Sequence, residues 1–354
     1  MNVFDYVRPA SVDEAVAAAT EPGAAYLAGG TNLLDLMKGG TRHPTRIVDI
    51  RRLPGLDRIE TLADGAIRIG ALVTNAALAR NGDVREAAPA VAEALLSGAS
   101  PQLRNAATVG GNLMQRTRCA YFTDPHSACN RRTPGAGCDA HGGDTRGQAV
   151  LGWSEACIAT HPSDFCVPLL ALDAVVEIAG PAGSRDLPLD ALHRLPGDTP
   201  AVETALEPGE LITAVRLPPS AAGFAGHARY LKLRERTSYA FALVSAAAAL
   251  RMEDGVIAEA RLALGGVAAK PWRSAAAEAS LAGAPASPEA FRAAAALALQ
   301  GARPSGDNAA KIELAGRVAA RALALAAAGT PETIPALPAS VFATAPVHGA
   351  TAHG

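Results

Sequence analysis

The 354-residue chain lacks the compositional signatures of several large protein classes. Its 32 Lys and Arg residues are balanced by 34 Asp and Glu residues, so no basic excess exists for binding nucleic acid through its phosphates. No apolar run approaches the roughly 18 to 20 residues of a membrane helix, which argues against a transmembrane protein. The N-terminal residues show no basic and apolar segments of a secretory signal, so we expect any export to depend on a partner.

Aromatic residues and familiar nucleotide motifs are scarce as well. Phe, Trp and Tyr make up 4% of the chain, against 34 Gly and 25 Pro residues, which indicates a loop-rich α+β protein with an aliphatic core. No Gly-x-Gly-x-x-Gly fingerprint lies between a predicted strand and helix, and no Walker A motif is present. Ser-His-Asp, paired-carboxylate and His-Glu-x-x-His patterns are also missing, so hydrolysis has no support.

The length predicts about two domains. We place their boundary at Pro218-Pro219 and the small residues that follow, giving a first domain at 1–222 and a second at 223–329. In the second domain we predict strands at 227–236 and 239–252, then a hairpin turn at Asp254-Gly255 and a return strand at 256–267. Ala-rich helices follow to residue 328, and residues 330–354 carry prolines without a periodic face, which predicts a disordered tail.

Two glycine turns have nearly the same sequence, Gly29-Gly30-Thr31-Asn32-Leu33 and Gly110-Gly111-Asn112-Leu113. The first lies between a predicted strand at 24–28 and a short helix, an arrangement that binds anions. Glycine lets the backbone approach a phosphate, and Thr or Asn adds neutral donors. Each turn alone is equally well explained as a tight turn, but the repetition favours a dinucleotide held between the two.

All five cysteines fall in one window, Cys119, Cys129, Cys138, Cys157 and Cys166. Their spacings match neither a zinc ribbon nor the common ferredoxin run. Residues 115–150 lack periodicity, however, and a loop of that length needs something to order it. Disulfides in an exported protein, a zinc site with His126 or His141, and plain buried thiols remain alternatives. Cys166, in an apolar helix predicted at 164–172, best suits the last of these.

A third segment, residues 229–245, combines Arg229, Lys232, Arg234 and Arg236 with Tyr230 and Tyr239. A surface strand is the simpler explanation. In a flavin site, a lysine near the ring edge favours the reduced anionic flavin and a tyrosine can stack on the ring.

These features together resemble a known family. The motifs are Ala-Gly-Gly-Thr-Asn-Leu at 28–33, Arg-Asn-x-x-Thr-Val-Gly-Gly-Asn-Leu at 104–113, Pro-Ser-Asp at 162–164, Ser-Tyr-Ala-Phe-Ala-Leu-Val at 238–244 and Leu-Gly-Gly-Val-Ala at 264–268. They resemble the FAD-binding subunits of the xanthine dehydrogenase family of molybdenum hydroxylases, over residues 1 to about 328. The cysteine loop at about 115–160 is similar to the [4Fe–4S] insertion in the FAD subunits of bacterial periplasmic aldehyde oxidoreductases.

The resemblance implies an α+β fold, with a two-subdomain FAD-binding domain of the vanillyl-alcohol-oxidase (PCMH) type followed by a smaller domain of antiparallel sheet plus helices. It assigns FAD contacts to Tyr26, Leu27, Ala28, Gly29, Gly30, Thr31, Asn32, Leu33, Leu34, Thr108, Val109, Gly110, Gly111, Asn112, Asp164, Ile212 and Lys232. It assigns the ligands of a [4Fe–4S] cluster to Cys119, Cys129, Cys138 and Cys157, leaving Cys166 outside the motif.

The resemblance also implies partners. A large molybdenum subunit would oxidise an aldehyde, and a small subunit with two [2Fe–2S] clusters would pass electrons to FAD in a heterotrimer, for delivery to an external acceptor. The same resemblance implies a periplasmic location, reached by export with a signal-bearing partner, and a cytoplasmic location is the alternative. A nucleotide-binding scaffold with structural zinc in the cysteine loop is the alternative, and a free-standing flavin oxidase lacks an evident acid–base set.

Overall fold

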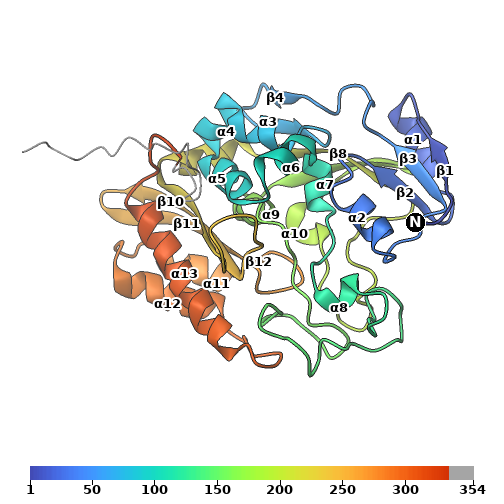
Figure 1. Ribbon diagram of the computed structural model, residues 1–354. Helices are drawn as coiled ribbons and strands as arrows, with labels where there is room; N and C mark the ends of the chain where they lie inside the picture. Colours follow the sequence, from blue (N-terminus) through green and yellow to red (C-terminus); the bar gives the residue numbers. More distant parts are fainter. Residues whose placement is uncertain (335–354) are drawn as a thin grey trace, which may run out of the picture.

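The structure is a computed structural model that describes residues 1–334, in which three β-sheets are surrounded by helices (Figure 1). Its mixture of helices with largely antiparallel sheets confirms the α+β expectation. The predicted tail begins inside this range, and the hydroxyl of Thr330 accepts a 2.8 Å hydrogen bond from the backbone N–H of Ala228. The remainder of that tail, residues 335–354, lies outside the described residues.

The N-terminal subdomain is a small parallel sheet in the order β1-β3-β2. Ser11 caps its first helix by accepting a hydrogen bond from the Glu14 N–H at 3.2 Å, and the Glu14 carboxylate accepts from the Ala10 N–H at 2.8 Å. The elements are β1 (Asp5–Val7), α1 (Val12–Ala19), β2 (Ala24–Leu27), α2 (Leu33–Lys38) and β3 (Arg46–Asp49).

The second subdomain is an antiparallel sheet in the order β4-β5-β8-β6-β7, with short helices packed on it. Its strands are β4 (Ile59–Thr61), β5 (Ile67–Gly70), β6 (Val175–Gly180), β7 (Gly183–Pro188) and β8 (Leu211–Leu217). Its helices are α3 (Asn75–Arg80), α4 (Gly82–Ala87), α5 (Pro89–Ser97), α6 (Pro101–Ala106), α7 (Val109–Leu113), α9 (Cys166–Ala171) and α10 (Leu189–Leu192). Between α7 and α9 runs the cysteine loop, whose one helix is α8 (Ala120–Thr123). Figure 1 shows this loop at one end of the molecule.

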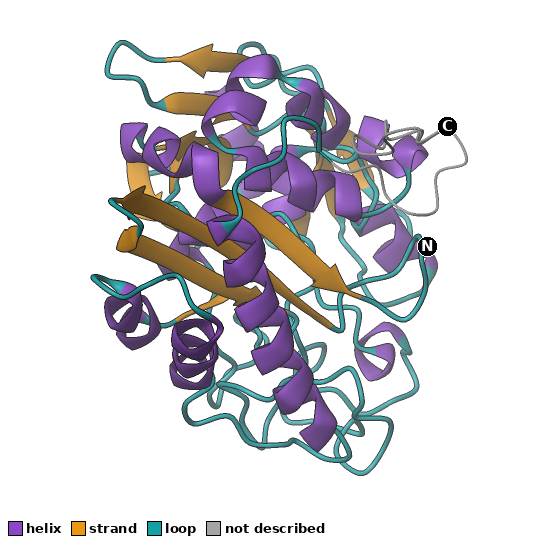
Figure 2. Cartoon of the chain, turned by 90° about the vertical axis from the view of Figure 1, so that its left-hand side faces the viewer, coloured by secondary structure: helices purple, strands orange, loops and turns teal. Residues whose placement is uncertain are grey.

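The third sheet has the antiparallel order β12-β11-β10-β9. Its strands are β9 (Ala228–Leu233), β10 (Val244–Glu253), β11 (Val256–Gly265) and β12 (Trp272–Arg273). A 3₁₀ segment, η1 (Pro219–His227), leads into it, and α11 (Ala275–Leu281), α12 (Pro288–Ala298) and α13 (Ala309–Ala327) follow. Figure 2 shows these three helices together on one face, with the long α13 lying across the strands.

Strand β10 is buried on both of its faces. Ala246 and Ala248 join the core formed with α11–α13, whereas Ala247 and Ala249 join the core of the second subdomain. Side chains alternate between the faces of a strand, so a strand covered on both sides shows no alternation in its sequence. This double burial outweighs the helix propensity of the alanine run and confirms the predicted hairpin, whose Asp254 and Gly255 both adopt positive φ.

Two predicted elements differ from the structure. Residues 234–236 and 239–243, which we predict as strand, instead belong to a loop at 234–243. In this loop Tyr239 adopts φ 51° and its carbonyl accepts hydrogen bonds from Arg236. Helix α9 begins at Cys166 instead of at Asp164, and the two residues before it form a turn in which the Val167 N–H donates to the Asp164 carbonyl at 3.3 Å. Both departures free side chains for the large cavity described below.

Among residues 1–334, no helix combines the length and apolar character needed to cross a membrane.

Gly70 ends β5 where the chain passes close to Leu56, and a Cβ at this position would lie well inside contact distance of the Leu56 carbonyl. We therefore expect Gly70→Ala to lower the free energy of unfolding by about 1–3 kcal/mol, as overpacking does elsewhere. Gly82→Ala is the matched control, because nothing lies within 4 Å of the added methyl group. Urea denaturation of both variants measures the effect, and equal stability would contradict this packing.

Candidate functional site

A cavity of about 720 Å³ lies where the two glycine turns, α5, the start of α9 and the 234–243 loop converge. Its volume falls in the range of cofactor pockets. Six of the predicted FAD contacts line it, namely Thr31, Asn32, Gly111, Asn112, Asp164 and Lys232.

The first glycine turn lies against the end of α6, just before the second glycine turn. A Cβ on Gly29 would lie well inside contact distance of the Ala106 carbonyl, so only glycine permits this approach. Thr108 caps α7 by accepting the N–H of Gly111 at 3.3 Å, and Asn32 Oδ1 accepts the N–H of Arg116 at 3.0 Å. Asn32 Nδ2 is buried and has no hydrogen-bond partner within the described chain. A buried donor of this kind beside a cavity suits an oxygen-rich ligand such as a phosphate.

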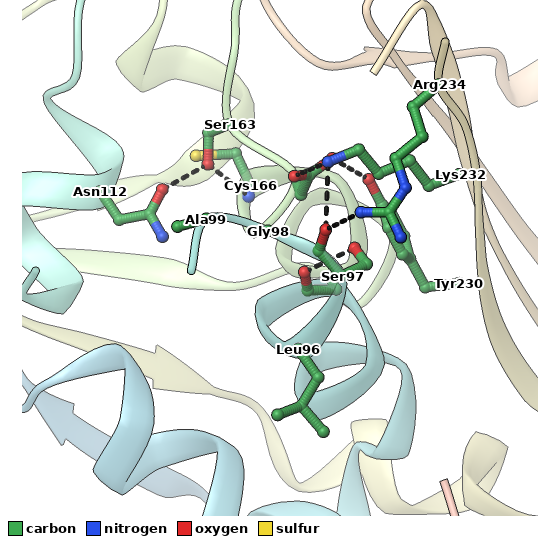
Figure 3. Close-up of polar contacts among 12 residues, drawn as sticks. Leu96, Ser97, Gly98, Ala99, Asn112, Ser163, Cys166, Tyr230, Lys232 and Arg234 are labelled. Carbon is green, nitrogen blue, oxygen red and sulfur yellow. Dashed lines mark hydrogen bonds and ion pairs between the residues drawn. The ribbon is translucent and has the colours of Figure 1, made fainter. Parts of the chain in front are cut away.

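A buried ion pair forms another wall of the cavity (Figure 3). Lys232 Nζ lies 2.8 Å from one carboxylate oxygen of Asp164, and the Tyr230 hydroxyl donates to the other at 2.6 Å. Lys232 and Arg234 both also donate to the carbonyl of Ser97, at 3.2 and 3.0 Å. Burial raises the pKa of Tyr230 well above its usual value, so the hydroxyl stays a donor. These contacts join β9 to the end of α5.

A second polar contact ties the other glycine turn to α9. Asn112 Oδ1 accepts a 2.8 Å hydrogen bond from the Ser163 hydroxyl, close to Cys166 (Figure 3). Cys166 is fully buried, and burial raises the pKa of its thiol to about 12. It is therefore a buried, protonated thiol.

The remaining predicted FAD contacts do not line the cavity. Leu27, Ala28, Gly29, Gly30, Leu33 and Leu34 build the first turn behind Thr31 and Asn32, and Thr108, Val109 and Gly110 support the second. Tyr26 points away and donates to the carbonyl of Gly209 at 2.8 Å. Ile212 is a core residue of β8, 4% exposed.

The cavity also has lining residues that sequence reasoning missed, among them Gly98, Arg104, Gln115, Arg118 and Arg146. Burial lowers the pKa of both Arg104 and Arg118. Arg104 opens the second glycine motif and Gln115 and Arg118 follow it, so adjacency to the motif was the available signal.

The four loop cysteines Cys119, Cys129, Cys138 and Cys157 line one small cavity, as predicted for ligands of a common group. All five cysteines of the chain are free thiols, so the disulfide alternative is not borne out, and neither His126 nor His141 lines this cavity. Gln148 Nε2 donates to the Cys119 sulfur at 3.5 Å, and the N–H of Ala159 donates to the Cys157 sulfur at 3.5 Å. Cys119 also lines the large cavity, so the two sites adjoin.

The electrostatics of the cysteine cavity suit a metal group. Burial raises the pKa of the Cys119 and Cys138 thiols, so ionising them requires compensating positive charge. Arg131 supplies some, since it lines the same small cavity as the four thiols. Arg116 and Arg131 share the single carboxylate of Glu203, which leaves an excess of one positive charge in this group. The four thiols and their surroundings therefore fit an anionic metal–thiolate group.

A second cluster of potential ligands comprises His161, Cys166 and His193, whose ligating atoms lie within 4.8 Å of one another. The two rings are 4.3 Å apart, and burial lowers the pKa of His193 to about 4 and that of His161 well below its usual value. His193 Nε2 lies 2.8 Å from the carbonyl of Leu113. Two neutral imidazoles and a protonated thiol give this group no negative charge, so it forms a neutral polar contact under α7.

Comparisons with known proteins agree with this arrangement. The family model described as "FAD binding domain in molybdopterin dehydrogenase" matches residues 2–220, and that described as "CO dehydrogenase flavoprotein C-terminal domain" matches residues 229–326. The chain is 50% identical to the aldehyde oxidoreductase FAD-binding subunit PaoB of Escherichia coli, over 93% of this chain and 99% of that protein. It is 30% identical to the carbon monoxide dehydrogenase medium chain of Afipia carboxidovorans, over 76% of each.

Among solved structures, carbon monoxide dehydrogenase from Hydrogenophaga pseudoflava superposes with a TM-score of 0.72 at 30% identity, covering 92% of this chain and 98% of that one. The family matches extend over both halves of the chain, and the structural match supports the expected FAD-binding domain followed by a sheet-plus-helix domain. The chain therefore belongs to the FAD-binding subunits of the molybdopterin dehydrogenase family and is an oxidoreductase subunit.

Proposed function

We propose that this chain is the FAD- and [4Fe–4S]-carrying electron-transfer subunit of a heterotrimeric, molybdenum-dependent aldehyde oxidoreductase. It takes electrons from a [2Fe–2S] subunit and passes them through FAD to an external acceptor, while a molybdenum subunit oxidises the aldehyde. The observation that carries this proposal is the convergence of four loop cysteines on one cavity that shares Cys119 with the large cavity. The 50% identity to an aldehyde oxidoreductase subunit supports the aldehyde as substrate class.

In the large cavity the two glycine turns would hold the FAD phosphates, and FAD supplies electron-transfer chemistry when bound. Thr31 and Asn32 offer neutral donors, and Asn32 Nδ2 is free to make a hydrogen bond. Lys232 adds a cation to the wall, but Asp164 neutralises most of its charge. We infer that this ion pair chiefly holds the cavity wall in place. Tyr26, Ile212 and the buried residues of the turns would either contact FAD through their backbone or support the turns that hold it.

The spacing of the cysteines favours a polynuclear cluster over zinc. A tetrahedral zinc ion, with Zn–S bonds of about 2.3 Å, brings its thiolates to about 3.8 Å from one another. Among the described residues, the ligand atoms of His161, Cys166 and His193 all lie within 4.8 Å of one another, and the loop cysteines do not form such a group. Four thiols spread around a shared cavity suit a larger iron–sulfur core.

Thr31→Val tests the phosphate site, because it removes a hydroxyl and nearly preserves the shape of the side chain. A hydrogen bond to a charged group contributes about 1.5–3 kcal/mol, so we expect FAD affinity to fall at least about tenfold. Flavin fluorescence during dialysis measures the loss. Thr61→Val on the exposed strand β4 is the control and should retain FAD. Equal retention by the two variants would argue against this phosphate site.

Cys138→Ser tests the metal site in the full chain, purified anaerobically and assayed for FAD, iron, sulfide and zinc together with its EPR spectrum. We expect one FAD and about four irons per wild-type chain, with iron lost and FAD kept in the variant. Cys166→Ala is the control and should keep its iron, because Cys166 lies outside the loop cavity. Zinc without iron would favour a structural zinc loop, and absence of FAD would contradict the proposed electron-transfer function.

We further propose a periplasmic location, reached by export together with a signal-bearing partner, on the basis of the resemblance of the cysteine loop to periplasmic enzymes. Cell fractionation should find the chain in the periplasm only when the partner's signal is intact. A chain that stays cytoplasmic with an exported partner would overturn this proposal.

A further inference from the structure

Lys311 is a buried cation that the proposed electron transfer does not use. It is one of four lysines in the chain, lies in the first turn of α13 and is 2% exposed. Lys232 and Lys270 have carboxylate partners, but no carboxylate lies within 4.0 Å of Lys311 Nζ in the described part of the chain. Nζ instead donates to the carbonyls of Gly147 and Gln148, at 2.8 and 2.7 Å. Burial lowers its pKa to about 7, so keeping an amine here costs stability and calls for a compensating role.

Residues next to Lys311 in the sequence donate hydrogen bonds to the same part of the cysteine loop, residues 145–149. Asn308 Nδ2 donates to the Gln148 carbonyl at 3.2 Å and to the Ala149 carbonyl at 3.4 Å. The N–H of Asp307 donates to the Thr145 hydroxyl at 2.7 Å. Residues 305–311 thus provide polar partners for the backbone of residues 147–149, which a loop of this kind lacks on its own.

This contact reaches the cysteine cavity through one residue. The carbonyl of Gln148 is held by Lys311 and Asn308, and its side-chain amide donates to the Cys119 sulfur at 3.5 Å. Gln148 is 7% exposed, so its two ends are fixed in a closed environment. Hydrogen bonds from outside the ligand set orient metal ligands and tune reduction potentials.

We propose that Lys311 is a positioning residue for the metal site, which acts through Gln148 to orient the Cys119 sulfur. The C-terminal domain thereby completes the cysteine site of the first domain. This inference rests on the proposed [4Fe–4S] function, because Cys119 must be a cluster ligand for its orientation to affect electron transfer.

The test compares Lys311→Met, which removes the donors at similar side-chain length, with Lys270→Met as the control in the same domain. Each full chain is purified anaerobically with its partner subunits, and iron per FAD is measured before and after exposure to a chelator. We expect Lys311→Met to retain FAD but lose at least twofold more iron than wild type. Lys270→Met should match wild type.

Gln148→Leu isolates the hydrogen bond to sulfur, because it leaves the Gln148 carbonyl available to Lys311. We expect this variant to keep its iron, to shift the cluster's EPR signal, and to make its midpoint potential more negative, since the thiolate loses a donor. The same EPR signal and midpoint potential are measured for Lys311→Met, and we expect both to shift in the direction seen for Gln148→Leu. A purely structural role for Lys311 would lower the iron content of Lys311→Met without shifting either one.

The outcomes separate the two proposals. A wild-type chain without iron overturns the proposed cluster function itself. A wild-type chain with iron, alongside a Lys311→Met variant with the same iron per FAD and the same chelator resistance, overturns only the role of Lys311. If Lys311→Met fails to fold, the Gln148→Leu variant decides, and an unchanged potential and EPR signal overturn the inference.

Discussion

The burial of the third sheet on both faces is the constraint on which the rest of this structure depends. Alternate side chains of β10 enter two different cores, one with α11–α13 and one with the second subdomain. Alanine is small enough to let helices approach closely from both sides, and the double burial contributes stability that alanine's helix propensity cannot match. The sheet of the second domain therefore packs directly against the first domain, and residues of both domains line the large cavity.

Polar groups where the two domains meet form pairs. Asp164 comes from the approach to α9 and Lys232 from β9, and each is nearly removed from solvent. Breaking a buried ion pair by removing one partner costs about 3–5 kcal/mol, so the contact strongly resists separation of the domains. Within the first domain, Gly29 meets the end of α6 at Ala106, so contacts within one domain and an ion pair between the two domains both hold the cavity walls. A cofactor in such a cavity would meet a largely preformed site.

The cysteine loop depends more on charge and hydrogen bonding than the sheet does. Its one helix has only four residues, and burial disfavours ionisation of Cys119 and Cys138. Arg131 beside Cys157 offsets part of that cost, and a metal group would offset the rest. The segment from Ser305 to Lys311 secures the end of the loop from the other domain. Electrostatics and hydrogen bonds therefore add to the burial of Phe122, Leu151 and Ile158 in ordering this segment.

The sequence by itself determined the local features of this protein: the glycine turns, the capped helices, the Asp254-Gly255 hairpin and the separation of Cys166 from the four loop cysteines. Interactions between residues close in sequence decide these features, so neighbouring residues are enough to predict them. Only the tertiary structure decided that residues 234–243 leave the sheet to line a cavity, that Ile212 stays in the core, and that Lys311 contacts Gln148. The Lys311 contact joins segments 163 residues apart, and Ile212 is buried in a sheet whose strands come from separate parts of the chain, so no local pattern encodes either.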